Sequence, residues 1–260
     1  MSEFRISPEN VNITLISKQE YDCIACKKLN RDPDASIQFK NYFVKLYQID
    51  DNVSPSKYEL NGNDLKYSLA HGYEEIIIDK YKHGDNFEDY SVEDINKLLL
   101  ILKDRVSSLS RYDFGDNLLI SRNLSGHGFF DLVITPVPRI KYTKLNINNL
   151  GDREILRTEN FVVYSPFAPI KTFEINISPI KHISFKDIDE VISFDLSGLL
   201  FNLLHKIKTI KEFVIIENFN KHFVLRLFNE YIDPFSFLNI NRVYEYPERF
   251  AESIRKLYEK

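Results

Sequence analysis

Two cysteines and two histidines are the residues of this sequence whose types and spacing could bind a metal ion. Cys23 and Cys26 form a Cys-x-x-Cys pair. A tetrahedral zinc ion bound by this pair needs two further ligands, for which His83 and His127 are the candidates. A Cys-x-x-Cys pair also occurs in redox sites, and a lone histidine is more often a structural or surface residue than a ligand. The residue types alone therefore leave metal binding, redox chemistry and a structural role open.

The segment that leads to His83 occurs twice in the chain. Glu75–Asp79 precedes His83 and Glu174–Ser178 precedes His182, at a spacing of 99 positions in both cases. Both runs are rich in isoleucine, which predicts β-strands that end near a histidine.

A long helix is predicted after each histidine, because apolar residues recur there at the i, i+3, i+4, i+7 spacing of a helix packed on a core. Ser91, with Asp94 three residues later, is expected to cap the first helix. The apolar positions are Ile95, Leu98, Leu99, Leu102, Val106 and Leu109 in the first copy, and Ile188, Val191, Ile192, Leu196, Leu199, Leu200, Leu203 and Ile207 in the second.

The repetition continues beyond the helices. Ile120–Asn123 leads to His127 as Ile215–Asn218 leads to His222, and both pairs of segments are 95 positions apart. A unit of this length is a duplicated domain and not a solenoid repeat. We expect an α+β protein with two antiparallel sheets and packed helices in one pseudo-twofold unit, with residues 1–145 in the first repeat and 146–260 in the second.

Two segments fall outside the strict repetition. The first copy contains extra residues, which we place in a polar loop from Val53 to Gly72. Pro247 is followed by Phe250, Ile254 and Leu257, and this pattern predicts a terminal helix.

Composition excludes several classes of protein. The 260 residues carry a formal net charge of -4, so no overall basic field favours nucleic-acid binding. No apolar run reaches the length of a membrane span, and the N-terminus lacks the pattern of a signal peptide. Two cysteines so close in sequence make no disulfide framework. We expect a cytoplasmic protein without a nucleic-acid or membrane partner.

The motifs resemble those of galactose-1-phosphate uridylyltransferases, a branch of the histidine-triad superfamily. Cys23–Cys26, Glu74–His83 and Asn123–Pro138 resemble successive motifs of the first repeat of that family. Phe161–Ala168 and Pro247–Arg255 resemble its second repeat and its C-terminal helix. The resemblance covers most of the chain and implies a duplicated histidine-triad-like fold.

The same resemblance implies the roles of individual residues. Cys23, Cys26, His83 and His127 match the four ligands of one zinc ion in that family. Asn123 and Asp131 match positions near the nucleotide. Dimers are common in the family, so a homodimer is one expected assembly.

The position of the family's nucleophile departs from the pattern. In the family, the second histidine of a His-Pro-His-x-Gln motif attacks the α-phosphorus of a nucleotide sugar and holds the nucleotidyl group covalently. The corresponding run here is His127-Gly128-Phe129-Phe130-Asp131, which puts Phe129 at the nucleophile and Asp131 at the glutamine. A phenyl ring cannot attack phosphorus, and a carboxylate repels a diphosphate. In a second alignment, Ser125-Gly126-His127 replaces the motif and His127 becomes the nucleophile.

Three functions follow from these alternatives. The first is a zinc-binding, catalytically degenerate relative that binds a nucleotide, a sugar phosphate or a protein. The second is an active nucleotidyltransferase, of the UDP-glucose:hexose-1-phosphate uridylyltransferase or dinucleotide phosphorylase type, that uses His127. The third is an assembly subunit whose task is protein contact.

Overall fold

The computed structural model describes residues 2–6, 13–17, 26, 45–49, 61–62, 66–79, 87–111, 117–124, 129–135, 147–218, 222–238 and 240–258. The strands are β1 (Glu3–Ile6), β2 (Ile13–Ile16), β3 (Lys45–Ile49), β4 (Lys66–Leu69), β5 (Tyr73–Ile78), β6 (Asn117–Asn123), β7 (Phe129–Ile134), β8 (Glu154–Arg157), β9 (Phe161–Tyr164), β10 (Glu174–Pro179), β11 (Glu212–Asn218), β12 (His222–Phe228) and β13 (Ile240–Val243). The helices are α2 (Val92–Leu109), α3 (Glu190–Lys206) and α4 (Pro247–Tyr258), and the short 3-10 turns are η1 (Phe87–Asp89), η2 (Gly151–Arg153), η3 (Phe185–Asp187) and η4 (Pro234–Leu238).

Both repeats contribute to one nine-stranded sheet. Its strand order is β3-β5-β7-β6-β11-β12-β10-β9-β8, and every neighbouring pair is antiparallel. The central pair β6–β11 joins the repeats, and Ile120 of the first repeat pairs with its counterpart Ile215 of the second. The order of strands outward from this pair is the same on both sides, apart from the extra edge strand β8. The predicted pseudo-twofold unit is confirmed, with a single sheet running through both repeats.

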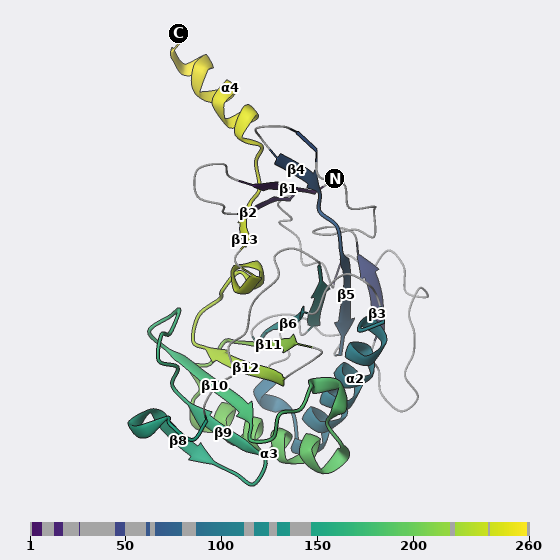
Figure 1. Ribbon diagram of the computed structural model, residues 1–260, viewed down its shortest axis with the longest axis vertical. Helices are drawn as coiled ribbons and strands as arrows, with labels where there is room; N and C mark the ends of the chain where they lie inside the picture. Colours follow the sequence, from purple (N-terminus) through teal and green to yellow (C-terminus); the bar gives the residue numbers. More distant parts are fainter. Residues whose placement is uncertain are drawn as a thin grey trace.

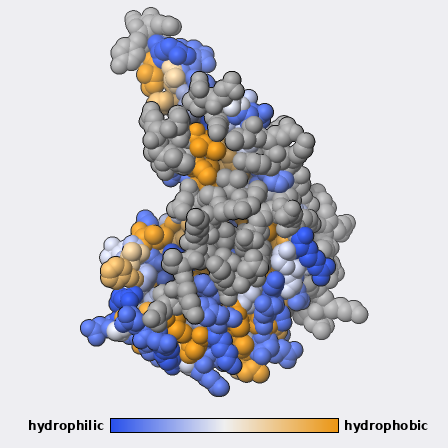
Figure 2. Space-filling view, in the orientation of Figure 1, coloured by the Kyte–Doolittle hydropathy of each residue, from blue (hydrophilic) through white to orange (hydrophobic). Residues whose placement is uncertain are grey.

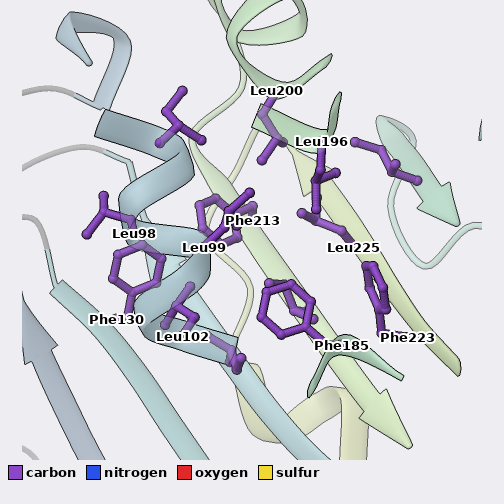
Figure 3. Packing of buried hydrophobic residues seen from close by; sticks show 14 of the residues in the cluster. Leu98, Leu99, Leu102, Phe130, Phe185, Leu196, Leu200, Phe213, Phe223 and Leu225 are labelled. Carbon is purple, nitrogen blue, oxygen red and sulfur yellow. The ribbon is translucent and has the colours of Figure 1, made fainter. Parts of the chain in front are cut away.

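The two long helices α2 and α3 pack together on one face of this sheet, which we call the helix face (Figure 1). Alternate residues of the central strands point toward them, as expected for side chains that alternate across a sheet. Figure 3 shows the resulting core, in which leucines of both helices meet phenylalanines of the sheet. The labelled members are Leu98, Leu99, Leu102, Phe130, Phe185, Leu196, Leu200, Phe213, Phe223 and Leu225.

Each long helix begins at a capping side chain. The Ser91 hydroxyl accepts a hydrogen bond from the Asp94 backbone N–H at 3.1 Å, and the Asp94 carboxylate accepts one from the Ser91 N–H at 3.3 Å. This reciprocal pair is the capping box predicted from the sequence. Asp189 caps α3 by accepting from the Ile192 N–H at 2.8 Å.

Removal of the first cap is expected to weaken the protein measurably. Ser91→Ala leaves the Asp94 N–H without its side-chain acceptor, so we expect the free energy of unfolding to fall by about 1 kcal/mol in a urea titration. Ser108→Ala in the same helix is the matched control, because the Ser108 hydroxyl only donates back to the Asp104 carbonyl at 3.0 Å. Equal losses in the two variants would contradict the capping role.

A second, smaller sheet covers the middle of the opposite face of the large sheet, which we call the small-sheet face. Its order is β13-β2-β1-β4, and the β13–β2 pair is parallel. Together with η4 it encloses a second core made of Phe4, Leu15, Ala70, Leu119, Val133, Val214, Ile216, Phe228, Ile232, Phe235, Phe237 and Ile240. The α+β class with two sheets is thus confirmed, although the sheets do not correspond to one repeat each.

Two predicted segments have different outcomes. The polar insertion predicted from Val53 to Gly72 is more than a loop, because it contains strand β4 of the small sheet. The predicted terminal helix is confirmed as α4, which begins at Pro247 and extends away from the sheets (Figure 1). Among the described residues, no helix is both long and apolar enough to cross a membrane.

Strands β5 and β10 do not superpose at the spacing of 99 found in the sequence, whereas β6 and β11 correspond at the spacing of 95. Phe87 and Phe185 begin equivalent 3-10 turns, and Ser91 and Asp189 cap equivalent helices, at a spacing of 98 positions in both cases. At the sequence spacing of 99, a residue of β5 is matched with one that points to the other face of β10. Figure 1 shows the two halves of the sheet flanking α2 and α3. Matching residue types therefore locate the repeat, but they do not show to which face of the sheet each side chain points.

Candidate functional site

The residues expected to bind zinc lie mostly outside the described part of the chain. Of the four, only Cys26 is described, and it is half-buried. Cys23, His83 and His127 lie outside the described residues. No group of three or more histidine, cysteine or acidic side chains that could hold a metal ion is found within the described ranges. The zinc site therefore stays a prediction.

The described strands that lead to the two candidate histidines are neighbours. The last residue of β5, Ile78, pairs with the first residue of β7, Phe129. His83 follows β5 by five residues, and His127 precedes β7 by two. Because an extended residue spans at most about 3.6 Å, both histidines are within chain reach of this shared strand end.

Phe129 and Asp131 point to the small-sheet face. Their neighbours in sequence, Phe130 and Leu132, belong to the core beneath the helices, so the alternate residues face the other way. Phe129 and Asp131 are both half-buried. The predicted positions of the nucleophile and of the phosphate-binding glutamine therefore share one face of β7, occupied by a phenyl ring and a carboxylate.

Within the described strands, the neighbours of Asp131 on this face of the sheet include a second acidic residue. Its cross-strand partners are Ile76 on β5 and Ser121 on β6. Glu74 lies two residues from Ile76 on the same face of β5 and is buried. A carboxylate at the position of Asp131 cannot donate a hydrogen bond to a diphosphate, and its charge repels that of the diphosphate. Asn123, the other predicted nucleotide-binding residue, ends β6 and pairs with Glu212 of β11.

A buried charged cluster holds the ends of β5 and β6 together on the helix face. The Arg122 guanidinium lies 2.8 Å from an Asp79 carboxylate oxygen, and both side chains are almost fully inaccessible to solvent. The Tyr90 hydroxyl donates to the same oxygen at 2.8 Å. The rings of Phe87 and Phe130 lie 4.6 Å and 4.5 Å from the guanidinium carbon, a cation–π arrangement. Burial, followed by the charge of Asp79, raises the pKa of Tyr90 well above its ordinary value.

This cluster was not predicted from the sequence, although a signal for it was present. Asp79 directly follows the apolar run of β5, and Arg122 lies just after the apolar run of β6. A charged side chain at the end of a buried strand needs a buried partner of opposite charge. A second missed pair is Arg105 with Glu75, which form two hydrogen bonds at 2.8 Å and 2.9 Å between α2 and β5. Burial nevertheless raises the pKa of Glu75 above its ordinary value.

The second repeat places a carboxylate where the first has Arg122. Glu217 lies 95 positions after Arg122, accepts a short hydrogen bond from the Ser184 hydroxyl, and accepts another from the Phe185 N–H at 2.8 Å. Burial raises the pKa of Glu217 to about 7, despite these hydrogen bonds. The 3-10 turn before the long helix thus contacts the Arg122 guanidinium in the first repeat and the Glu217 carboxyl group in the second.

The histidines of the second repeat lie side by side. His222 begins β12 and is buried, His182 follows β10 and is exposed, and their ring centroids are 5.6 Å apart. Arg226, four residues after His222 on β12, makes an ion pair with Glu174 at 3.3 Å. His205 on α3 stacks on Phe201, as expected for a histidine at a helix surface.

Comparison with known proteins places this arrangement in a recognised fold. No protein-family model matches the sequence, and no curated protein sequence matches it. A uridylyltransferase structure has a TM-score of 0.68 at 18% identity, with 88% of this chain and 86% of that chain covered. A GalT-like protein from Arabidopsis thaliana has a TM-score of 0.60 at 19% identity, and an Arabidopsis thaliana ADP-glucose phosphorylase with bound ADP-glucose has 0.59 at 16%; both alignments cover 98% of each chain. The chain therefore has the duplicated α+β fold of uridylyltransferase and its GalT-like structural neighbours.

Proposed function

We propose that this protein is a zinc-binding member of the uridylyltransferase-like fold that binds a nucleotide or a sugar phosphate without forming a covalent nucleotidyl intermediate. The observation that carries the proposal is the chemistry of one face of β7. Phe129 and Asp131 share that face, and neither side chain can replace an imidazole nucleophile or an amide donor to phosphate.

The proposed zinc site is supported by the arrangement of the strands around it. Ile78, the last residue of β5, pairs with Phe129, the first residue of β7. His83 follows Ile78 in the chain and His127 precedes Phe129, so both histidines belong to segments that start from this shared strand end. Two thiolates and two imidazoles are a donor set that suits a closed, structural zinc site. Cys23, Cys26, His83 and His127 would hold the ion, and the zinc would fasten the N-terminal segment to the sheet.

Retention of ligand binding is supported by the fold. The ADP-glucose phosphorylase that shares this fold was solved with bound ADP-glucose. A protein that keeps this architecture and lacks a nucleophile can still bind a ligand, because binding and covalent chemistry depend on different groups.

Native mass spectrometry of the purified protein tests both parts of the proposal. We expect one zinc ion per chain and no covalent gain in mass after incubation with UDP-glucose, UTP, ATP or ADP-glucose. His127→Ala should lose zinc and stability together, whereas His205→Ala, which changes an exposed histidine on α3, should keep the zinc.

A nucleotidyl adduct would overturn the proposal. An adduct that disappears in His127→Ala, while most of the zinc remains, would identify His127 as a nucleophile and the protein as an active nucleotidyltransferase. Zinc without any nucleotide or sugar-phosphate binding would instead favour a protein partner as the ligand.

A further inference from the structure

The small-sheet face of the second repeat is polar, unlike the middle of the same face, where an apolar core lies under the small sheet. Arg226 on β12, Asn176 on β10 and Tyr164 on β9 lie side by side there, because Asn176 pairs with both of the others. Ser178, two residues further along β10, shares a 3.2 Å hydrogen bond with the Tyr164 hydroxyl. Side chains of three neighbouring strands thus form one polar row.

Two buried polar atoms of this row lack a hydrogen-bond partner within the described part of the chain, Asn176 Oδ1 and Arg226 Nε. Asn176 as a whole is 4% exposed, and Arg226 uses Nη1 for its ion pair with Glu174. A buried polar group without a partner is costly, so a bound water or ligand is expected to supply one. A hydroxyl group fits this pair of atoms, because it donates to Oδ1 and accepts from the Nε–H.

A pair of histidines lies at the end of the same strands. His222 is the first residue of β12 and points to the small-sheet face, because the next residue, Phe223, belongs to the core beneath the helices. Lys181 and His182 follow β10, and both are exposed. Hydrophilic residues predominate on the lower part of the molecule, where Figure 1 draws the strands of the second repeat (Figure 2). Protonated imidazole and ammonium groups donate strong hydrogen bonds to phosphate.

The strand pairing shows which positions of the two repeats correspond. Strands β6 and β11 correspond at a spacing of 95 positions, so Ile216 is the counterpart of Ser121. Ser121 pairs with Asp131 of β7, and Ile216 pairs with Val224 of β12. Residues of β7 and β12 therefore correspond at a spacing of 93 positions.

The counterparts of the polar groups in the first repeat are less suited to phosphate. The corresponding pairs are His222 with Phe129, Arg226 with Val133, and Asn176 with Glu74. The second repeat thus has an imidazole, a guanidinium and an amide where the first has a phenyl ring, an isopropyl group and a carboxylate. Because a carboxylate repels phosphate, these positions favour phosphate binding in the second repeat.

We propose that the second repeat binds a sugar phosphate or a nucleotide, with the phosphate at His182 and His222 and a sugar hydroxyl between Asn176 and Arg226. His222 and Arg226 are four residues apart on one strand, so their Cα atoms are about 13 Å apart. The ligand must therefore carry its phosphate and its hydroxyl on different parts, as a sugar phosphate or a nucleotide does. This inference rests on the proposed function for the class of ligand and adds the place where the ligand binds.

Isothermal titration calorimetry of the full-length protein with UDP-glucose and with inorganic phosphate tests both ends of the site. His182→Gln should weaken the binding of both probes by roughly tenfold, because a charge-assisted hydrogen bond is lost. Asn176→Leu should weaken the binding of UDP-glucose by roughly tenfold and that of inorganic phosphate much less, because the amide contacts only the sugar. His205→Gln changes an exposed histidine on α3 and should bind both probes as the natural protein does.

The stability of Asn176→Leu separates ligand binding from a structural role. Leucine has a similar shape and removes a buried amide that lacks a partner, so the variant should unfold at the same or a higher urea concentration. A loss of stability with unchanged affinity for UDP-glucose would show that a buried water fills this place and would overturn the inference. Full affinity in both His182→Gln and Asn176→Leu would also overturn it, while the proposed function would stand. A natural protein that binds no sugar phosphate or nucleotide would overturn both.

Discussion

Replacement of Arg122 by methionine is expected to lower the free energy of unfolding by about 3 to 5 kcal/mol, because it leaves the Asp79 carboxylate charged, buried and without its cation. Arg122 and Asp79 have side-chain exposures of 1% and 0%, and their closest atoms are 2.8 Å apart. The methionine also removes the cation that lies over the Phe87 and Phe130 rings. Urea titration at pH 7, monitored by circular dichroism, measures the loss.

A solvent-exposed ion pair provides the control. Lys256→Met breaks the 2.7 Å pair with Glu252, but the two side chains are 66% and 57% exposed, so solvent screens the pair and we expect a loss of less than about 1 kcal/mol. The double variant Asp79→Leu/Arg122→Met removes both buried charges and should recover part of the stability lost in the single variant. A double variant as unstable as the sum of the two single variants would contradict a mutual ion pair.

Replacement of Glu217 by glutamine is expected to flatten the pH dependence of stability. Burial raises the folded-state pKa of Glu217 from 4.5 to about 7, so the folded chain binds a proton that the unfolded chain has already released between these values. Stability from this group is therefore full below the unfolded pKa and is lost as the pH rises through the folded pKa. The loss amounts to about 3 kcal/mol at pH 8, and Glu217→Gln, which cannot ionise, should avoid most of it.

The Ser184 hydroxyl provides a variant with the opposite effect. It donates to Glu217 and lowers the pKa of that carboxyl, against the larger effect of burial. Ser184→Ala should therefore raise the Glu217 pKa further and steepen the loss of stability between pH 5 and pH 8. Thermal unfolding temperatures measured at half-unit pH intervals compare the three proteins. Parallel curves for the natural protein and Glu217→Gln would show that Glu217 is ionised in the folded state.

Local patterns in the sequence predicted the elements of the fold well. The apolar spacing from Ile95 to Leu109 predicted α2, and Ser91 with Asp94 predicted its first turn, because both signals depend on residues within a few positions of one another. Pro247 likewise marked the start of α4.

Strand pairing and the direction of side chains depend on residues far apart in the sequence, and local patterns could not predict them. The pairing of β6 with β11 joins segments of different repeats, and no residue of Asn117–Asn123 specifies its partner strand. Glu75 and Glu174 match in type at the spacing of 99, yet Glu75 pairs with Arg105 on the helix face and Glu174 with Arg226 on the small-sheet face. A shift of one residue in the alignment of two strands moves every side chain to the opposite face of the sheet. The residue types alone do not reveal such a shift.

The candidate site was predictable only in its residue types. The expected places of Phe129 at the nucleophile position and Asp131 at the glutamine position stay predictions, and the structure adds that the two residues share a face of β7. The position of buried Glu74 on the same face of the sheet and the Arg122 cluster on the helix face were not predictable, because each arises from the way two or three strands meet.

The pairing of Ile120 with Ile215 has an evolutionary consequence. In a single-copy precursor, the same strand would have met its own copy in another chain across a true twofold axis, which makes that precursor a homodimer with two identical halves. Joining the two copies in one chain would make the subunit contact an internal one that no longer depends on protein concentration. Two joined halves would also be free of the requirement to remain alike. Arg122 and Glu217, at matching positions with opposite charges, record how far each half has since diverged.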